Sequence, residues 1–459
     1  MTTRPITLLV LFAACSPPGD PGGSAPDSDS SAGAGTTAAD TKTDTGPTVT
    51  TETGADSMDA GTSDAPTTGT DPTTGTDPTT GTDPTSDTGD EPAPDLEGAL
   101  GCAGVFNPDQ ILDLHLTMAP VDWQTVLGDV TFAIYVPAQF HCGDEAPINV
   151  AVRRKRSGGL NKVGLKVDFN EFVKGQRWHD LRKLSLENGV SSGSNADDAA
   201  VRDLVGEYLG WRIMKLGMVI GSRAALAELR VNDELIGAYV NVEQVDTRFL
   251  KDRFGDNDGW LVKKSGGEGD GPQTHETDGL EDPYAAYFCF WEAGGMACPP
   301  PSDDVLLAEL PQRVDIPQML RTGAVNAYIG NTDGPLFKNN NWYYYDWAGG
   351  GRAYMPTDLD TTMSVFTNVL SSEDIPGGGA FEEVMFIHWK PDYQAYLSEL
   401  VQSHAPPSVV LEELDRVLAV AGPSLDADPW VSGTAAEAVS DLGDWWTARD
   451  KDVRSQLGL

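Results

Sequence analysis

The chain has 459 residues, with 70 Asp and Glu against 31 Lys and Arg, so its formal net charge is −39. Charge of this sign disfavours binding to nucleic acid and to anionic membrane surfaces. A basic protein substrate or divalent cations would suit such a surface, although solubility alone explains the charge equally well.

The first fifteen residues predict a bacterial lipoprotein signal peptide. Arg4 precedes an uncharged apolar run over 6–14, which has the length of a signal-peptide core and is too short to span a bilayer. Cys15 follows Phe12 and two alanines, an arrangement similar to the bacterial lipobox apart from the Phe. We expect Cys15 to be lipidated and the protein to be anchored in the cell envelope outside the cytoplasm, at the outer membrane or cell surface. An ordinary signal peptide with an incidental cysteine is the alternative.

Residues 16–95 form an acidic segment rich in Thr, Ser, Gly and Pro. This segment holds sixteen Asp or Glu against a single Lys, and three copies of T-T-G-T-D-P run from Thr67 to Pro84. A segment of this composition has almost nothing to bury, so we expect it to be disordered and to act as a tether. The folded domain is then expected over 96–459.

Four cysteines remain after Cys15, and an even number suits an oxidising compartment. Proximity in the sequence favours two disulfides, Cys102–Cys142 and Cys289–Cys298. A structural zinc site is the alternative, although the spacing contains no C-x-x-C pair.

The pattern of the domain predicts an α+β fold, with a sheet-rich N-terminal part and a helical C-terminal part. Alternation and turn residues predict a strand over 111–116, a strand over 184–186 and two hairpins, whereas helical spacing predicts a helix that Asp197 or Asp198 caps. The hairpins are expected over 148–152 with 163–169 and over 226–231 with 236–242, the helix over 199–215, and later strands over 342–345 and 353–355.

The stretch 331–362 is richest in residues that carry chemistry. Asp333 is expected at the end of a helix that begins near Pro317, and Asp358 and Asp360 follow the second strand of a hairpin. Phosphoryl transfer needs an Asp to accept the proton of the attacking hydroxyl and oxygen ligands to hold magnesium. Neither H-R-D nor D-F-G is present, so the residues alone are equally compatible with a structural hairpin or a carboxylate calcium site.

Several blocks in the same order resemble the CotH kinase family, named for the spore coat protein H. They comprise N-x-D at 331–333, an Asn before an aromatic strand, D-x-D at 358–360, L-R-K-L-S-L at 181–186 with Arg202, the stretches 236–246 and 259–263, and W-W-T-A-R at 445–449. The resemblance covers roughly 149–457. Thr357 stands where the family usually has Trp before the Asp pair.

The resemblance implies an atypical protein-kinase-like fold that uses ATP and Mg²⁺ or Mn²⁺ to phosphorylate secreted or surface proteins on Ser or Thr. Asp333 then becomes the catalytic base, and Asp358 becomes the leading metal ligand. Asp360 and Asn341 assist with the metal. Lys166 matches an early K-x-F strand of the family and is expected to contact the ATP phosphates. Glu243 is expected to pair with that lysine, and Lys263 is a second candidate for the phosphate contact.

A surface adhesin or binding module on the same fold is the alternative function, because some CotH-like proteins on fungal surfaces act as adhesins. The scarcity of ATP outside a bacterial membrane favours the adhesin. The intact set of Asp and Asn residues favours the kinase, because an adhesin does not need it.

Overall fold

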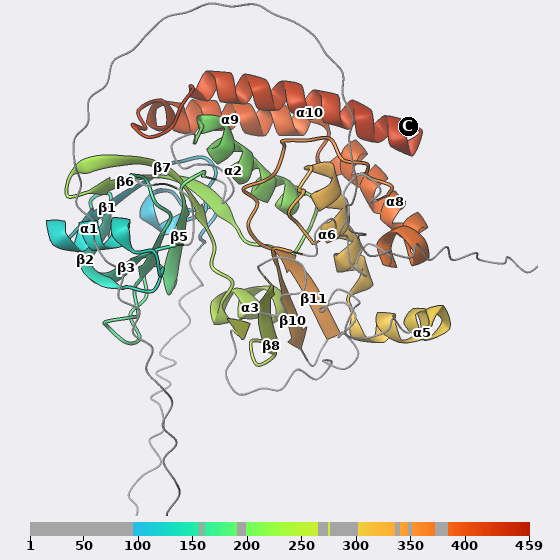
Figure 1. Ribbon diagram of the computed structural model, residues 1–459, viewed down its shortest axis with the longest axis horizontal. Helices are drawn as coiled ribbons and strands as arrows, with labels where there is room; N and C mark the ends of the chain where they lie inside the picture. The colour runs from blue at the N-terminus through green and yellow to red at the C-terminus, as the bar shows by residue number, and fades with distance from the viewer. Residues whose placement is uncertain are drawn as a thin grey trace, which may run out of the picture. The chain divides into compact units, whose positions relative to one another are not determined.

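Seven strands in the N-terminal part of the domain close into a barrel (Figure 1). The structure is a computed structural model, and it describes residues 95–155, 159, 161–190, 199–264, 274–275, 302–335, 340–347, 351–371 and 384–459. The barrel strands, in spatial order, are β1 (Leu112–Thr117), β2 (Val136–Cys142), β3 (Ile148–Arg154), β4 (Leu165–Asp168), β5 (Lys183–Glu187), β7 (Glu234–Val242) and β6 (Ala224–Val231).

Alternating side chains explain why these strands enclose a core. In β1, Leu112, Leu114 and Leu116 are buried inside the barrel, and the residues between them face outward. Neighbouring barrel strands are antiparallel except β1 and β6, whose parallel pairing closes the ring. Helix α1 (Pro120–Gly128) contacts β2 and β3 from outside.

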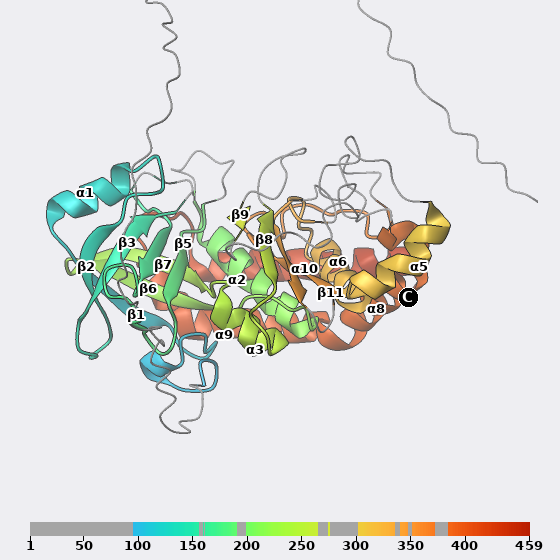
Figure 2. The same cartoon turned by 90° about the horizontal axis from the view of Figure 1, so that it is seen from below.

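Helix α2 (Val201–Leu216) contacts both the barrel strands β6 and β7 and the helices of the C-terminal part (Figure 2). Its apolar residues are buried nearly all round, as expected of a helix enclosed by other elements. The helix begins after Ala200, whose backbone amide donates to the Asp203 side chain at 3.3 Å. The predicted caps, Asp197 and Asp198, lie outside the described residues.

A second sheet of four strands follows the barrel, in the order β11-β10-β8-β9. Helix α3 packs on it through an apolar cluster that includes Phe249, Leu250 and Tyr343. The elements are α3 (Thr247–Phe254), β8 (Trp260–Lys264), β9 (Thr274–His275), β10 (Trp342–Trp347) and β11 (Gly351–Pro356).

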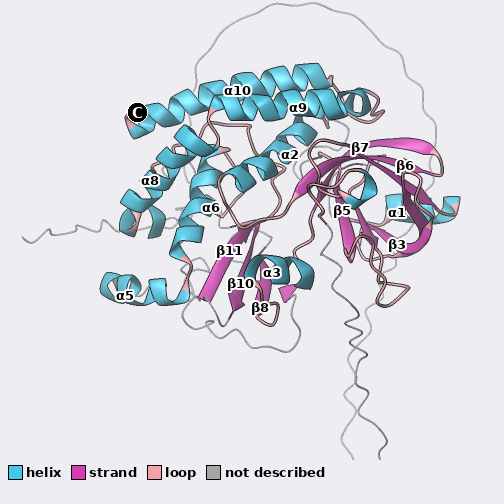
Figure 3. Cartoon of the chain, turned by 180° about the vertical axis from the view of Figure 1, so that it is seen from behind, coloured by secondary structure: helices cyan, strands magenta, loops and turns pink. Residues whose placement is uncertain are grey.

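The C-terminal part is helical, and Figure 3 shows most of its helices to one side of the barrel strands. Its main helices are α5 (Asp303–Arg313), α6 (Ile316–Tyr328), α8 (Lys390–Glu399), α9 (Pro407–Asp426) and α10 (Ala435–Leu457). Arg449 of α10 is fully buried and donates to the carbonyls of Ala327, Tyr328 and Thr367. These bonds fasten α10 to the end of α6. None of the helices in the described ranges combines the length and the apolar character needed to cross a bilayer.

The expected α+β class, with a sheet-rich N-terminal part and a helical C-terminal part, is confirmed. Both predicted hairpins and the 342–355 strand pair are present. The helix before Asp333 is shorter than predicted, because α6 ends at Tyr328 and Gly330 takes a left-handed φ of 64°. Asn331 to Asp333 therefore lie in the turn after the helix.

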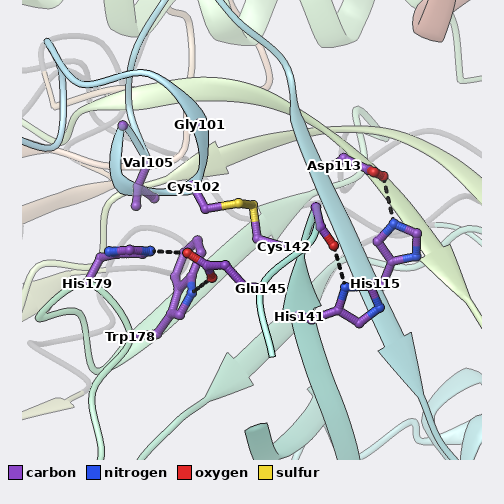
Figure 4. Close-up of a disulfide and its surroundings, with 12 residues drawn as sticks. Gly101, Cys102, Val105, Asp113, His115, His141, Cys142, Glu145, Trp178 and His179 are labelled. Atoms are coloured by element: carbon purple, nitrogen blue, oxygen red, sulfur yellow. Dashed lines mark hydrogen bonds and ion pairs between the residues drawn. A yellow bond between two sulfur atoms is a disulfide. The ribbon is translucent and has the colours of Figure 1, made fainter. Parts of the chain in front are cut away.

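The predicted disulfide between Cys102 and Cys142 is present, with the two Cα atoms 5.9 Å apart (Figure 4). It joins the short helix η1 (Gly101–Ala103) to the end of β2. The other predicted pair, Cys289–Cys298, lies outside the described residues, as do Cys15 and the proposed tether up to residue 94.

Candidate active site

A cavity of about 270 Å³ collects charged side chains from both parts of the domain. Five predicted site residues line it, namely Lys166, Glu243, Lys263, Asp358 and Asp360. The remaining charged lining residues are Arg153, Lys155, Glu187 and Glu207, and apolar lining comes from Phe132, Val190, Trp211, Val242, Val245 and Tyr343. Asp333 and Asn341 are not among the lining residues.

Three of the cationic residues that line the cavity, Arg153, Lys155 and Lys166, lie in or directly after the barrel strands β3 and β4. Lys166 of β4 donates through Nζ to Oε1 of Gln244. Burial lowers the pKa of Lys166 well below its usual range, and the nearby positive charges of Lys155 and Lys263 lower it further. Such crowding of ammonium groups is unfavourable in the protein alone, and a polyanionic ligand would relieve it.

Lys155, which follows β3, is a second cavity lysine that the sequence analysis missed. Its Nζ pairs with Glu187 and donates to Oγ of Ser185 at 3.1 Å. Burial lowers the pKa of Lys155 to about 8, against the opposing effects of Asp358 and Glu207. The available signal was the basic run over 153–156 at the end of a predicted strand.

Carboxyl groups also line the cavity. Glu207 of α2 is 4% exposed, and burial raises its pKa to about 8, with Asp360 and then Asp358 adding to the shift. A divalent cation beside these groups would offset their mutual repulsion. In the part of the chain that the structure describes, no three His, Cys, Asp or Glu side chains are placed to hold a metal ion by themselves. A cation here would draw on Asp358 and Asp360 together with phosphate and water oxygens, as Mg²⁺ commonly does.

Close packing of α2 holds the Asp358–Asp360 segment in place. Leu359, between the two aspartates, is fully buried against Gly210, where an added Cβ would lie 3.4 Å from Cδ1 of the leucine. Asp358 has a left-handed φ of 56°. Arg202 at the start of α2 donates to the carbonyl of Met363 at 2.7 Å. The helix therefore fixes the backbone on both sides of Asp360.

Asn331 organises the turn that carries Asp333. It is fully buried, and its Nδ2 donates to Oδ1 of Asn326 at 2.7 Å. Its own Oδ1 accepts from the Asp333 amide and from the Thr361 hydroxyl, each at 3.3 Å. The first residue of the N-x-D motif thus links the Asp333 turn to the residue after Asp360.

Asn341 makes a second link between Asp333 and the cavity. Its Nδ2 donates to Oδ2 of Asp333 at 2.8 Å, and its carbonyl accepts from the amide of Thr357 at 3.1 Å. Asn340 also donates to Oδ2 of Asp333, at 3.2 Å. Asp333 is therefore tied to Thr357, the cavity residue directly before Asp358.

The predicted pairing of Glu243 with Lys166 is wrong. Glu243 pairs instead with Arg223 and Arg253, whose Nη2 lies 2.9 Å from Oε2 of the glutamate. Two guanidinium groups that donate to one carboxylate hold it more strongly than a single ammonium group would. The glutamate that lies on a helix near a cavity lysine is Glu207, which the sequence analysis did not single out.

A family model matches the sequence of the chain, and some solved structures are similar to it. The family model described as CotH kinase protein matches residues 152–451. No curated protein matches the chain. Similar solved structures include a Helicobacter pylori proinflammatory kinase, CtkA, at 10% identity and a TM-score of 0.31, over 64% of this chain and 90% of that one. A Shewanella oneidensis toxin–antitoxin complex of HipA, HipB and operator DNA matches at 12% identity and a TM-score of 0.36, over 75% and 74%. At TM-scores this low neither likeness bears on activity.

Proposed function

Because this chain belongs to the CotH kinase family, we propose that it is an exported protein kinase that uses ATP and Mg²⁺ or Mn²⁺ to phosphorylate Ser or Thr of secreted or surface proteins. The observation that carries the proposal is the cavity, which brings Lys155, Lys166 and Lys263 together with the Asp358–Asp360 pair. A triphosphate with its metal ion requires both kinds of group, cationic side chains for the phosphates and carboxylates for the metal.

The residues present fit a metal-bound nucleotide. Lys155, Lys166 and Lys263 would contact phosphate oxygens, and Asp358 with Asp360 would hold the metal ion. The metal would shield the negative charge of the phosphates when it is bound. The apolar lining, including Phe132 and Val245, suits a nucleobase.

Asp333 is proposed as the general base. Its carboxylate is oriented by Asn340 and Asn341 and is tied through Asn341 to the backbone beside Asp358. A base in that position would accept the proton of a Ser or Thr hydroxyl. The net charge of −39 favours substrates with a basic surface.

The site of action is proposed to be the cell envelope. The support is the lipobox-like sequence at Cys15, the acidic tether over 16–95, and the Cys102–Cys142 disulfide, which suits an oxidising compartment. In this arrangement the lipid anchors the protein, and the tether over 16–95 separates the domain from the membrane.

Transfer from radiolabelled ATP tests the proposed activity. The purified chain is incubated with Mg²⁺ or Mn²⁺, and autophosphorylation and transfer to basic model proteins are scored, with the Asp333→Ala variant as the control. Label that appears with the wild type and not with the variant supports the kinase. Absence of nucleotide binding with either metal would refute it and would leave the adhesin.

A further inference from the structure

Glu243 occupies a buried position between two arginines next to the cavity. Its side chain is 2% exposed, and it pairs with Arg223, directly before β6, and with Arg253, in the last turn of α3. Its Oε2 also accepts from the backbone amide of Arg223 at 3.0 Å. The carboxylate of Glu243 therefore connects the end of β7 to the residue before β6 and to α3. Both of its oxygens are used in these contacts, so we do not expect it to bind a ligand.

The segment that begins at Glu243 forms part of the cavity. Residues 243–246, here called the linker, connect β7 to α3, and Glu243, Gln244 and Val245 line the cavity. Gln244 accepts the hydrogen bond from Lys166. At the other end Asp246 caps α3 by accepting from the amides of Arg248 and Phe249 at 2.9 and 3.2 Å. Movement of the linker would therefore move the acceptor that orients Lys166.

A second segment supports the arginine side of this arrangement. Residues 95–110, here called the strap, precede β1, and Cys102 of the strap is bonded to Cys142 of β2 (Figure 4). Phe106 of the strap is 1% exposed, and the guanidinium of Arg223 lies over its ring at 5.0 Å. The carbonyl of Val105 also accepts from Asn241 of β7 at 3.5 Å. The strap thus contacts Arg223 itself and β7, the strand that leads to Glu243.

We propose that Glu243 is a positioning residue, which fixes the linker and through Gln244 the orientation of Lys166, and that the disulfide-fastened strap supports it through Phe106 and Arg223. The effect on nucleotide binding rests on the proposed function, whereas the effect on the linker does not. Loss of Glu243 or of the disulfide then frees the linker while the barrel remains folded.

The test compares Glu243→Gln and the double variant Cys102→Ser/Cys142→Ser with a matched control, Glu413→Gln. Glu413 is 6% exposed and also binds two arginines, Arg212 and Arg416, yet it does not line the cavity. Hydrogen–deuterium exchange of the full chain is followed over the linker and α3, with the β3–β4 hairpin as an internal reference.

Faster exchange is expected over the linker and α3 in Glu243→Gln and, to a smaller extent, in the cysteine variant, with the hairpin unchanged. The KM for ATP should rise roughly tenfold while kcat stays near the wild-type value, because the freed linker weakens the hydrogen bond from Lys166 to Gln244, whereas Asp333 is unchanged. Glu413→Gln should leave linker exchange and KM unchanged.

Wild-type exchange over the linker in Glu243→Gln, or an equal increase in Glu413→Gln, would overturn the proposal. If Glu243→Gln does not fold, Glu243→Asp and Phe106→Leu provide the same comparison, and retention of wild-type linker exchange in both would count against the inference. If the wild type binds no nucleotide, the kinase proposal fails, and the exchange data still decide the role of Glu243.

Discussion

The side-chain amide of Asn341 donates to Oδ2 of Asp333 at 2.8 Å, while the backbone of Asn341 binds that of Thr357. Asn341 therefore helps to orient the Asp333 carboxylate and also links it to the backbone beside Asp358. Asn341 is 4% exposed and has a left-handed φ of 54°, a conformation that Asn tolerates better than most residues. These contacts separate the expected effects of changes at Asp333 and Asp358.

Replacement of Asp333 by Ala should strongly lower the rate of transfer while leaving metal–nucleotide binding intact. A lost general base typically lowers the rate by about 10²-fold or more. Asn341→Ala should lower the rate less, by about tenfold, because the base remains but loses an orienting hydrogen bond. Single-turnover transfer assays and thermal shift with Mg²⁺ and ATP check both. Loss of ATP binding in Asp333→Ala would contradict the assignment of Asp333 as the base.

Replacement of Asp358 by Ala should remove metal-dependent nucleotide binding. Without that carboxylate the metal loses a ligand, and the triphosphate meets the remaining acidic groups unshielded. The thermal shift produced by ATP with Mg²⁺ should disappear. Asp144→Ala, a change of the same chemistry at an exposed position outside the cavity, should keep the wild-type shift. An unchanged shift in Asp358→Ala would exclude it as the leading metal ligand.

Replacement of Lys155 or Lys166 by Met should weaken ATP binding by about tenfold or more, because each change removes a charged phosphate contact and keeps the length of the side chain. Lys183→Met is the matched control. Lys183 lies in β5, pairs with Asp168 at 2.9 Å and does not line the cavity. Titration of nucleotide at fixed Mg²⁺ measures the affinities. Equal losses in all three variants would show a general charge effect rather than specific contacts.

Acid should destabilise the wild type more than it destabilises the Asp129→Asn variant. A hydrogen bond from Thr131, joined by backbone amides of residues 131, 133 and 134, lowers the pKa of Asp129 to about 2 from an ordinary value of 3.8. The ionised carboxylate therefore stabilises the fold above about pH 4, and that contribution is lost as the pH falls through 2. Chemical denaturation between pH 2 and 5 follows the difference. A constant difference across this window would show that Asp129 does not titrate as stated.

The Cys15→Ser variant should leave the membrane fraction, because the lipid is the proposed anchor. Fractionation of cells that express each form, followed by immunodetection, gives the distribution. Retention of the variant in the membrane fraction would refute lipid anchoring at Cys15.

Mass spectrometry of unreduced peptides in the same samples should show Cys289 bonded to Cys298, and free thiols there would contradict the second predicted disulfide.

Local sequence patterns predicted most of the strands and the neighbouring placement of Asp333, Asp358 and Asp360. Alternation and turn residues are local properties, and Asn232 and Asp233 indeed take the left-handed conformations that a tight hairpin needs, with φ of 52° and 67°. The order of the motifs along 331–362 likewise required no knowledge of distant contacts.

The charge partners could not be predicted, because they depend on packing between distant segments. Glu207 reaches the Asp pair only because Gly210, one turn further along α2, admits Leu359 from about 150 residues later. Glu243 and Lys166 both line the cavity, yet Arg223 and Arg253 pair with the glutamate. Nothing in the local sequence indicates that Glu243 pairs with these two arginines rather than with Lys166.

The parallel pairing of β1 with β6 has a consequence for how copies of the protein meet. Because that pairing closes the barrel, its sheet has no edge strand to which a second chain could add. If the protein is lipid-anchored as proposed, its copies meet often on a two-dimensional surface. Strand addition between crowded copies would have to use the four-stranded sheet, whose outer strands in the described structure are β11 and β9, rather than the larger sheet that carries Lys166.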